Sequence, residues 1–114
     1  FEALRDRRIA LSQNVPISAH AAAQSPTKLG VKPGQTIAVE DAIKAVVTRS
    51  ANDVAVVIAE NLAGSESEFA KLMTRKAQAL FGYAPSVSLA EGLAQTAAWL
   101  EQNLHRYRIG TYAV

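Results

Sequence analysis

The 114-residue chain contains no cysteine, and aromatic residues make up only 6% of it. The absence of cysteine excludes disulfides, thiolate catalysis and cysteine-based zinc sites. No apolar run approaches the ~20 residues that a membrane-spanning helix needs, so no membrane span is predicted. Neither sign of charge dominates, because twelve Lys and Arg residues are interspersed with ten Asp and Glu residues. Nucleic-acid binding would need a clustered basic face, and the sequence predicts none.

The composition that remains is that of a globular protein, with 49% hydrophobic and 19% charged residues. The length fits one domain with a modest core. The two histidines, His20 and His105, lie far apart without a second ligand at helical spacing, so neither a metal nor a cofactor is expected. No signal peptide is visible, and the first residue is Phe1 rather than Met. We interpret this start as trimming, processing or an entry partway into a domain.

Three serines are each followed three residues later by an acid, just before a run of apolar residues at helical spacing. The pairs are Ser50 with Asp53, Ser65 with Glu68, and Ser88 with Glu91. This spacing predicts a capping box, in which the serine hydroxyl accepts from the backbone N–H of the acid and the carboxylate reaches back. Gly64 and Gly82 follow periodic runs and are predicted to end helices.

These signals predict an all-α fold, a small array of four to five helices. The segment 9–38 is expected to be rich in loops, with extended pieces near 15–18 and 36–39 that could form a minor β-hairpin. Residues 1–8 are expected to be the end of a helix, and a short helix is expected near 19–24. Longer helices are predicted from about residue 40 and over 51–63, 66–80 and 89–105. The apolar stripes expected on the first two are Ile43, Val46 and Val47, then Val54, Val57, Ile58 and Leu62.

A long ordered series of sequence segments in residues 1–80 matches a known family. The segments are Lys28 to Ile37 (KLGVKPGQTI), Val39 to Ile43 (VEDAI) and Thr48 to Ala55 (TRSANDVA), supported by AAAQ at 21–24 and AENLAGSE at 59–66. This part of the chain resembles the helical subdomain of serine-type D-alanyl-D-alanine carboxypeptidases, penicillin-binding proteins that act on peptidoglycan peptides. The resemblance identifies Ser50-Ala51-Asn52 as the S-x-N motif. It implies that the Ser50 hydroxyl relays a proton and that the Asn52 amide holds substrate, roles that suit these groups chemically.

The other two motifs of that family are not matched in the same way. K-T-G does not occur in the 114 residues. The bare pattern S-x-x-K, which in the family carries the nucleophile and its lysine base, occurs once, at Ser25-Pro26-Thr27-Lys28. Its proline and loop setting argue against the helix start that the nucleophile needs. The resemblance instead places this stretch in the loop before the S-x-N helices, and the nucleophile upstream of Phe1.

After Leu80 the resemblance to the carboxypeptidase family ends. The segments GYAP at 82–85, SLAEGL at 88–93 and TAAWLEQNL at 96–104 resemble the C-terminal end of an NAD-dependent nucleotide-sugar epimerase or dehydratase. The Gly-rich dinucleotide loop and the Tyr-x-x-x-Lys pair of that family are missing, so no cofactor and no activity come with this likeness. Residues 81–114 are expected to pack on residues 1–80 in one compact unit.

Two functions follow. The first is a non-catalytic helical protein, not an enzyme as it stands, which the resemblances imply to be a composite or fragment derived mainly from a peptidoglycan D-alanyl-D-alanine carboxypeptidase. In it Ser50 caps a helix and Asp53 closes the box. The second is part of a carboxypeptidase that is active only with a complementing chain. The family implies the periplasm or cell envelope, but the sequence itself leaves the compartment open.

A helical piece without the sheet and nucleophile helix of the family would expose the stripe of Ile43, Val46, Val54 and Val57. The helix at 89–105 could cover this stripe within one chain. Alternatively a second copy could cover it, because large exposed apolar patches usually become interfaces. We therefore expect a homo-oligomer formed through an apolar helix face.

Overall fold

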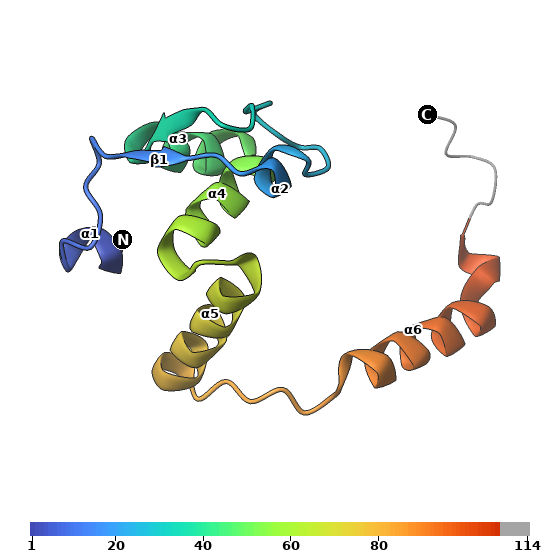
Figure 1. The fold of residues 1–114 in the computed structure, drawn as a ribbon. Coiled ribbons are helices and arrows are strands. Elements are labelled where there is room, and N and C mark those ends of the chain that lie inside the picture. Colours follow the sequence, from blue (N-terminus) through green and yellow to red (C-terminus); the bar gives the residue numbers. More distant parts are fainter. Residues whose placement is uncertain (108–114) are drawn as a thin grey trace.

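The structure is a computed structural model that describes residues 1–107 and is mostly helical (Figure 1). Its elements are α1 (Glu2–Arg5), β1 (Asn14–Pro16), α2 (Ala19–Ala22), β2 (Thr36–Ala38), α3 (Val39–Arg49), α4 (Asn52–Ala63), α5 (Glu66–Phe81), α6 (Leu89–Asn103) and the 3-10 helix η1 (Leu104–Arg106). The described residues contain six α-helices, so the predicted count of four to five was too low. Two of the six, α1 and α2, are single four-residue turns at the places where the sequence predicted a helix end and a short helix.

The two extended pieces pair as a two-stranded antiparallel sheet, with Val15 opposite Ile37. The prediction of a small β element is confirmed, but its connection is long, since α2 and the following loop lie between the strands. That loop is held at its end as well: the Ile17 N–H donates to the Gln35 carbonyl over 2.9 Å, and the Gly34 N–H donates to the Ile17 carbonyl over 3.0 Å. The sheet therefore anchors both ends of the loop segment.

Small aliphatic side chains from the strands and from α2, α3 and α4 form the core. One cluster contains Val15, Ile17, Ala21, Val39, Val56 and Val57, and a second contains Ala42, Ala45, Ala51 and Val54. Both clusters draw on α4 or on the residue directly before it. The helix is buried on more than one side, which makes α4 the central element and positions its first turn rigidly.

The predicted apolar stripe is correct for α4 at Val54 and Val57, which are fully buried, but only partly correct for α3. Val47 is 73% exposed, and α3 buries Val39, Ala42 and Ala45 instead. Alanine at the contact allows two helices to approach closely, so periodicity of large residues misses this face. The stripe expected to be bare is thus covered at Val54 and Val57.

The arm that follows α5 stands apart from the core (Figure 1). No residue of α6 is buried, and the radius of gyration is 18.5 Å, compared with about 13 Å for a compact domain of this length. Within residues 81–107 the structure does not show the expected packing on residues 1–80. A capped helix satisfies its own backbone hydrogen bonds, so α6 can form without that contact. The rest of the predicted second unit, from residue 108 on, lies outside the described residues.

None of the helices in residues 1–107 is long and apolar enough to cross a lipid bilayer.

Candidate functional site at the turn between α3 and α4

Ser50 lies at the sharp turn between α3 and α4, where only two residues separate the helices. Its backbone is left-handed, with φ 50° and ψ 41°, and its N–H donates to the Val46 carbonyl over 3.1 Å. Ser50 therefore ends α3, and Ala51 is the N-cap of α4. The prediction that Ser50 caps α4 and that Asp53 closes the box is wrong. A turn this short needs one left-handed residue, and a residue in that conformation cannot take the extended geometry of an N-cap.

The Ser50 side chain is exposed, and its hydroxyl makes no hydrogen bond with any part of the chain that the structure describes. A non-glycine residue in the left-handed region costs about 1–2 kcal/mol. Such strain is concentrated at functional sites, where the surrounding structure holds it in place. The turn thus presents a free hydroxyl at a fixed position without using it for capping.

Asp53 carries out a different task from the one its spacing predicts. Its carboxylate is fully buried and accepts three backbone hydrogen bonds from the loop between α2 and β2. The donors are the N–H groups of Leu29 over 2.9 Å, Gly30 over 2.8 Å and Val31 over 3.2 Å. A fourth comes from the N–H of Val54 over 2.9 Å. A loop that exposes several N–H groups next to a core needs an acceptor for them, and Asp53 supplies it.

Two opposing effects act on the pKa of Asp53. Burial raises it, because a carboxylate loses hydration, while the N–H groups of Leu29, Gly30, Val31 and Val54 lower it by stabilising the charge. The hydrogen bonds prevail, and the pKa of Asp53 lies below its ordinary value of 3.8. The side chain is therefore an anion at neutral pH and fixes the loop to the first turn of α4.

Asn52, the third residue of the predicted S-x-N motif, directly precedes Asp53 at the start of α4. Its backbone N–H donates to the Thr27 carbonyl over 2.8 Å, and its Nδ2 donates to the Ser25 carbonyl over 3.4 Å. The structure therefore brings Asn52 together with the loop that contains the single S-x-x-K pattern. Ser25 and Lys28 are both exposed and outside any helix, in agreement with the predicted loop setting.

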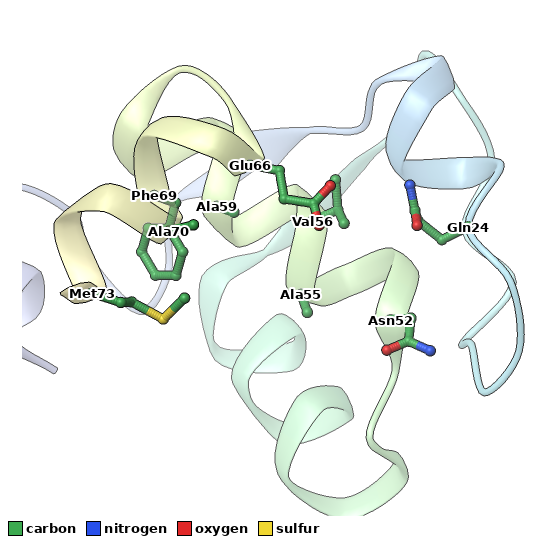
Figure 2. A pocket seen from close by; sticks show the side chains of 9 residues that line it. All are labelled: Gln24, Asn52, Ala55, Val56, Ala59, Glu66, Phe69, Ala70 and Met73. Carbon is green, nitrogen blue, oxygen red and sulfur yellow. The ribbon is translucent and has the colours of Figure 1, made fainter. Parts of the chain in front are cut away.

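An open groove of about 350 Å³ runs from Asn52 and Gln24, which follows α2, along α4 and α5. Figure 2 shows the carboxamides of Asn52 and Gln24 at one end and Phe69 and Met73 at the other. Small side chains of α4, Ala55 and Ala59 among them, form its floor. A carboxamide can both donate to and accept from a peptide bond, so this end of the groove is chemically suited to an extended peptide.

Gln24 and its neighbours were not identified from the sequence as site residues. Gln24 is fixed by a hydrogen bond from its Nε2 to the His20 carbonyl over 3.2 Å, and His20 Nε2 lies 3.4 Å from Glu66 Oε2. The only sequence signal at Gln24 was the segment AAAQ at 21–24, which resembles the carboxypeptidase family. No group of three or more metal-binding side chains is found in residues 1–107.

Comparison with known proteins gives the site its family. The sequence family described as D-alanyl-D-alanine carboxypeptidase matches residues 1–107. The chain belongs to this family. The carboxypeptidase DacF of Bacillus subtilis is 38% identical over 80 residues, which are 70% of this chain and 21% of that protein.

Solved carboxypeptidase structures agree with this assignment. The carboxypeptidase DacD of Francisella tularensis superposes with a TM-score of 0.69 at 26% identity, over 70% of this chain and 19% of its own. A peptidoglycan synthesis regulatory factor, PBP3, of Streptococcus pneumoniae superposes with a TM-score of 0.59 at 36% identity, over 66% of this chain and 23% of its own. The chain thus spans about a fifth of the length of the relatives it matches.

The family match extends through α6 and η1, whereas the relatives cover about seventy per cent of the chain. It therefore includes most of the segment that the sequence likened to an epimerase tail. That likeness stays a prediction, and so does the role of Ser50-Ala51-Asn52 as the S-x-N motif of the carboxypeptidase family.

Proposed function

We propose that this chain by itself is a non-catalytic helical member of the carboxypeptidase family. The observation that carries the proposal is the setting of its single serine–lysine pattern: Ser25 and Lys28 lie in an exposed loop. A serine nucleophile needs a base within hydrogen-bond reach and a fixed geometry. A loop position before α3 provides neither helix nor enclosed site, and K-T-G does not occur in the sequence.

A second candidate function is favoured by the turn at Ser50. In this candidate the chain contributes S-x-N to a D-alanyl-D-alanine carboxypeptidase site, and a complementing chain contributes the nucleophile, its lysine and K-T-G. The Ser50 hydroxyl is exposed and unused in the described structure, and Asn52 lines an open groove. Both groups are available to a peptide substrate, and the Asp53 clamp holds the turn that presents them.

Acylation by a fluorescent penicillin tests both candidates. We expect no covalent label on the chain alone, and a label on it that disappears in Ser25→Ala would overturn the non-catalytic proposal. The complementing partner is a family carboxypeptidase, such as that of Bacillus subtilis, from which the 80 matching residues have been removed. Under the second candidate, mixing restores label on this partner.

Variants of the motif make the second test specific. Ser50→Ala and Asn52→Ala should each lower the labelling rate of the mixture by roughly 10²-fold or more, as expected for proton-transfer and positioning groups. Ser67→Ala, an exposed serine of α5 outside the groove, should leave the rate unchanged. If the pieces do not associate, residues 1–80 are grafted in place of the removed segment, and an unlabelled graft that folds would exclude this candidate.

A further inference from the structure

The arm carries an apolar helix face that is largely exposed in residues 1–107. Leu89, Leu93 and Leu100 of α6 fall within about 40° of one another at 3.6 residues per turn, and Leu104 follows directly in η1. Leu89 is 80% exposed and Leu93 is 61% exposed, although leucine is among the residues that proteins most often bury. Glu91, Gln95 and Gln102 occupy the opposite side, so the helix is amphipathic but without a partner in the described structure.

A second groove, of about 200 Å³, lies between α1 and α5. Its floor is apolar and includes Leu62, Phe69, Leu72 and Met73. Its rim is charged: Lys76 Nζ lies 2.8 Å from Glu2 Oε1, and Arg8 lines the same groove. Neither Gln24 nor Asn52 lines it, so a partner in this groove would leave the end of the candidate site that carries the carboxamides open.

The two surfaces carry opposite charge. Residues 1–8 and 68–76, on either side of the groove, contain six Lys and Arg residues and three acids, a net +3. The helix α6 contains Glu91 and Glu101 and no Lys or Arg, a net −2. Opposite charge favours encounter between the helix and the groove and disfavours contact of two arms with each other.

We propose that the leucine face of α6 from one copy of the chain docks in the groove between α1 and α5 of a second copy, and that the two copies exchange arms reciprocally. In Figure 1 the chain leaves the end of α5 through a connecting segment, and α6 extends on the side of α5 away from α1. The helix α6 is 15 residues long, about 22 Å, and is linked to α5 through residues 82–88. It can therefore reach a neighbouring molecule without any change in the core.

Reciprocity halves the area that each helix–groove contact must bury. A specific interface buries roughly 1,200–2,000 Å² in total. In a two-fold exchange the same helix–groove contact forms twice, so each contact supplies half of that area. The exposed leucines of α6, together with Leu72 and Met73 in the groove, are the side chains that would become buried.

Light scattering coupled to size-exclusion chromatography tests the dimer. We expect about 24 kDa, twice the 12.1 kDa of the chain, with a shift towards the monomer on dilution. Leu93→Glu should raise the dissociation constant by at least tenfold, whereas Gln95→Glu, on the opposite side of α6, should change it by less than twofold. Circular dichroism checks whether both variants keep their helices. A monomer at every concentration, or a dimer that Leu93→Glu leaves intact, overturns the proposal.

A disulfide experiment identifies the surfaces, because the chain has no cysteine of its own. A tagged copy with Leu93→Cys is mixed with an untagged copy with Leu72→Cys and oxidised. The expected product is the mixed disulfide, and replacing Leu93→Cys by Gln95→Cys should reduce its yield at least tenfold. A chain with both Leu72→Cys and Leu93→Cys that closes an internal disulfide at all dilutions would instead show docking within one copy and overturn the exchange.

Discussion

Asp53 shows how much a single side chain can hold in a small domain. Among residues 1–107 it is the only charged residue that is fully buried. Its hydrogen bonds join the loop at 29–31 to the start of α4. Asp53→Asn removes the charge and turns an amide donor towards backbone N–H groups. We expect the free energy of unfolding to fall by about 2–4 kcal/mol, the usual cost of leaving buried hydrogen-bonding groups unpaired.

Urea denaturation of the wild type and Asp53→Asn measures this loss. The matched control is Asp41→Asn on the exposed surface of α3, where the carboxylate lies 3.9 Å from Lys44. Exposed pairs contribute little, so its midpoint should not move. If both variants unfold at the wild-type midpoint, the carboxylate does not clamp the loop.

The lowered pKa of Asp53 also predicts how stability depends on pH. The folded carboxyl group binds a proton less readily than the unfolded one, whose pKa is near the ordinary 3.8. The contribution of Asp53 is therefore complete well above pH 4 and is lost as pH falls through 3.8 towards the lower folded pKa. Thermal melts from pH 7 to 2 should show a steeper acid decline for the wild type than for Asp53→Asn. Parallel declines would contradict the hydrogen-bond pattern.

Ser50 is predicted to matter little for stability, so a loss of labelling in Ser50→Ala under the second candidate function would not reflect unfolding. Because its hydroxyl is free, Ser50→Ala should change the free energy of unfolding by less than about 0.5 kcal/mol, whereas loss of an N-cap costs about 1 kcal/mol. Ser50→Gly should stabilise the fold by up to about 1 kcal/mol, since glycine takes the left-handed conformation without strain. Denaturant midpoints distinguish these values. A loss near 1 kcal/mol in Ser50→Ala would restore the capping interpretation.

At the scale of elements, the serine–acid spacing identified two of the three helix starts correctly. The Ser65 and Ser88 hydroxyls accept from the N–H groups of Glu68 over 3.1 Å and Glu91 over 3.2 Å. The acids do not reach back as a full capping box requires: Glu68 instead accepts from Lys71 over 2.6 Å. The third spacing failed at Ser50, because spacing cannot show that α3 continues to Arg49 and leaves only a two-residue turn.

The two real caps should respond differently to substitution, because their helices have different surroundings. Ser65→Ala should lower the free energy of unfolding by about 1 kcal/mol, since α5 packs on α4. Ser88→Ala should reduce helical circular dichroism by fraying α6 without moving the main unfolding midpoint under dilute conditions. Equal shifts of that midpoint in the two variants would show that α6 unfolds together with the core.

Apolar periodicity located α4, α5 and α6 but did not tell which of them would be buried. The large residues of α5 and α6 match a helical period as well as those of α4 do, yet neither helix has a fully buried residue. The opposite error occurred at α3, where Ala42 and Ala45 form the contact and Val47 faces solvent. A periodic pattern shows which face of a helix is apolar. It does not show which element packs on that face, because that depends on contacts between residues distant in sequence.

On the scale of the whole molecule, the chain divides into a core and an arm. All fully buried hydrophobic residues of the described part lie between Ala3 and Ala59. The sequence segments that resemble the carboxypeptidase family indicated this core, because they concentrate in residues 21–66. The position of the arm could not be predicted, since α6 forms from its own caps and periodicity, and the sequence does not specify which surface it meets.

A chain that ends at Gly82 tests this division. Because α6 contributes no buried residue, the shortened chain should unfold cooperatively, with a free energy of unfolding within about 0.5 kcal/mol of that of the dilute full chain. The dependence on protein concentration should differ. Association stabilises the folded state by mass action, so the melting temperature of the full chain should rise with concentration while that of the shortened chain stays constant. Calorimetry over a concentration series measures both quantities, and a shortened chain that loses cooperative unfolding would show that the arm is part of the core.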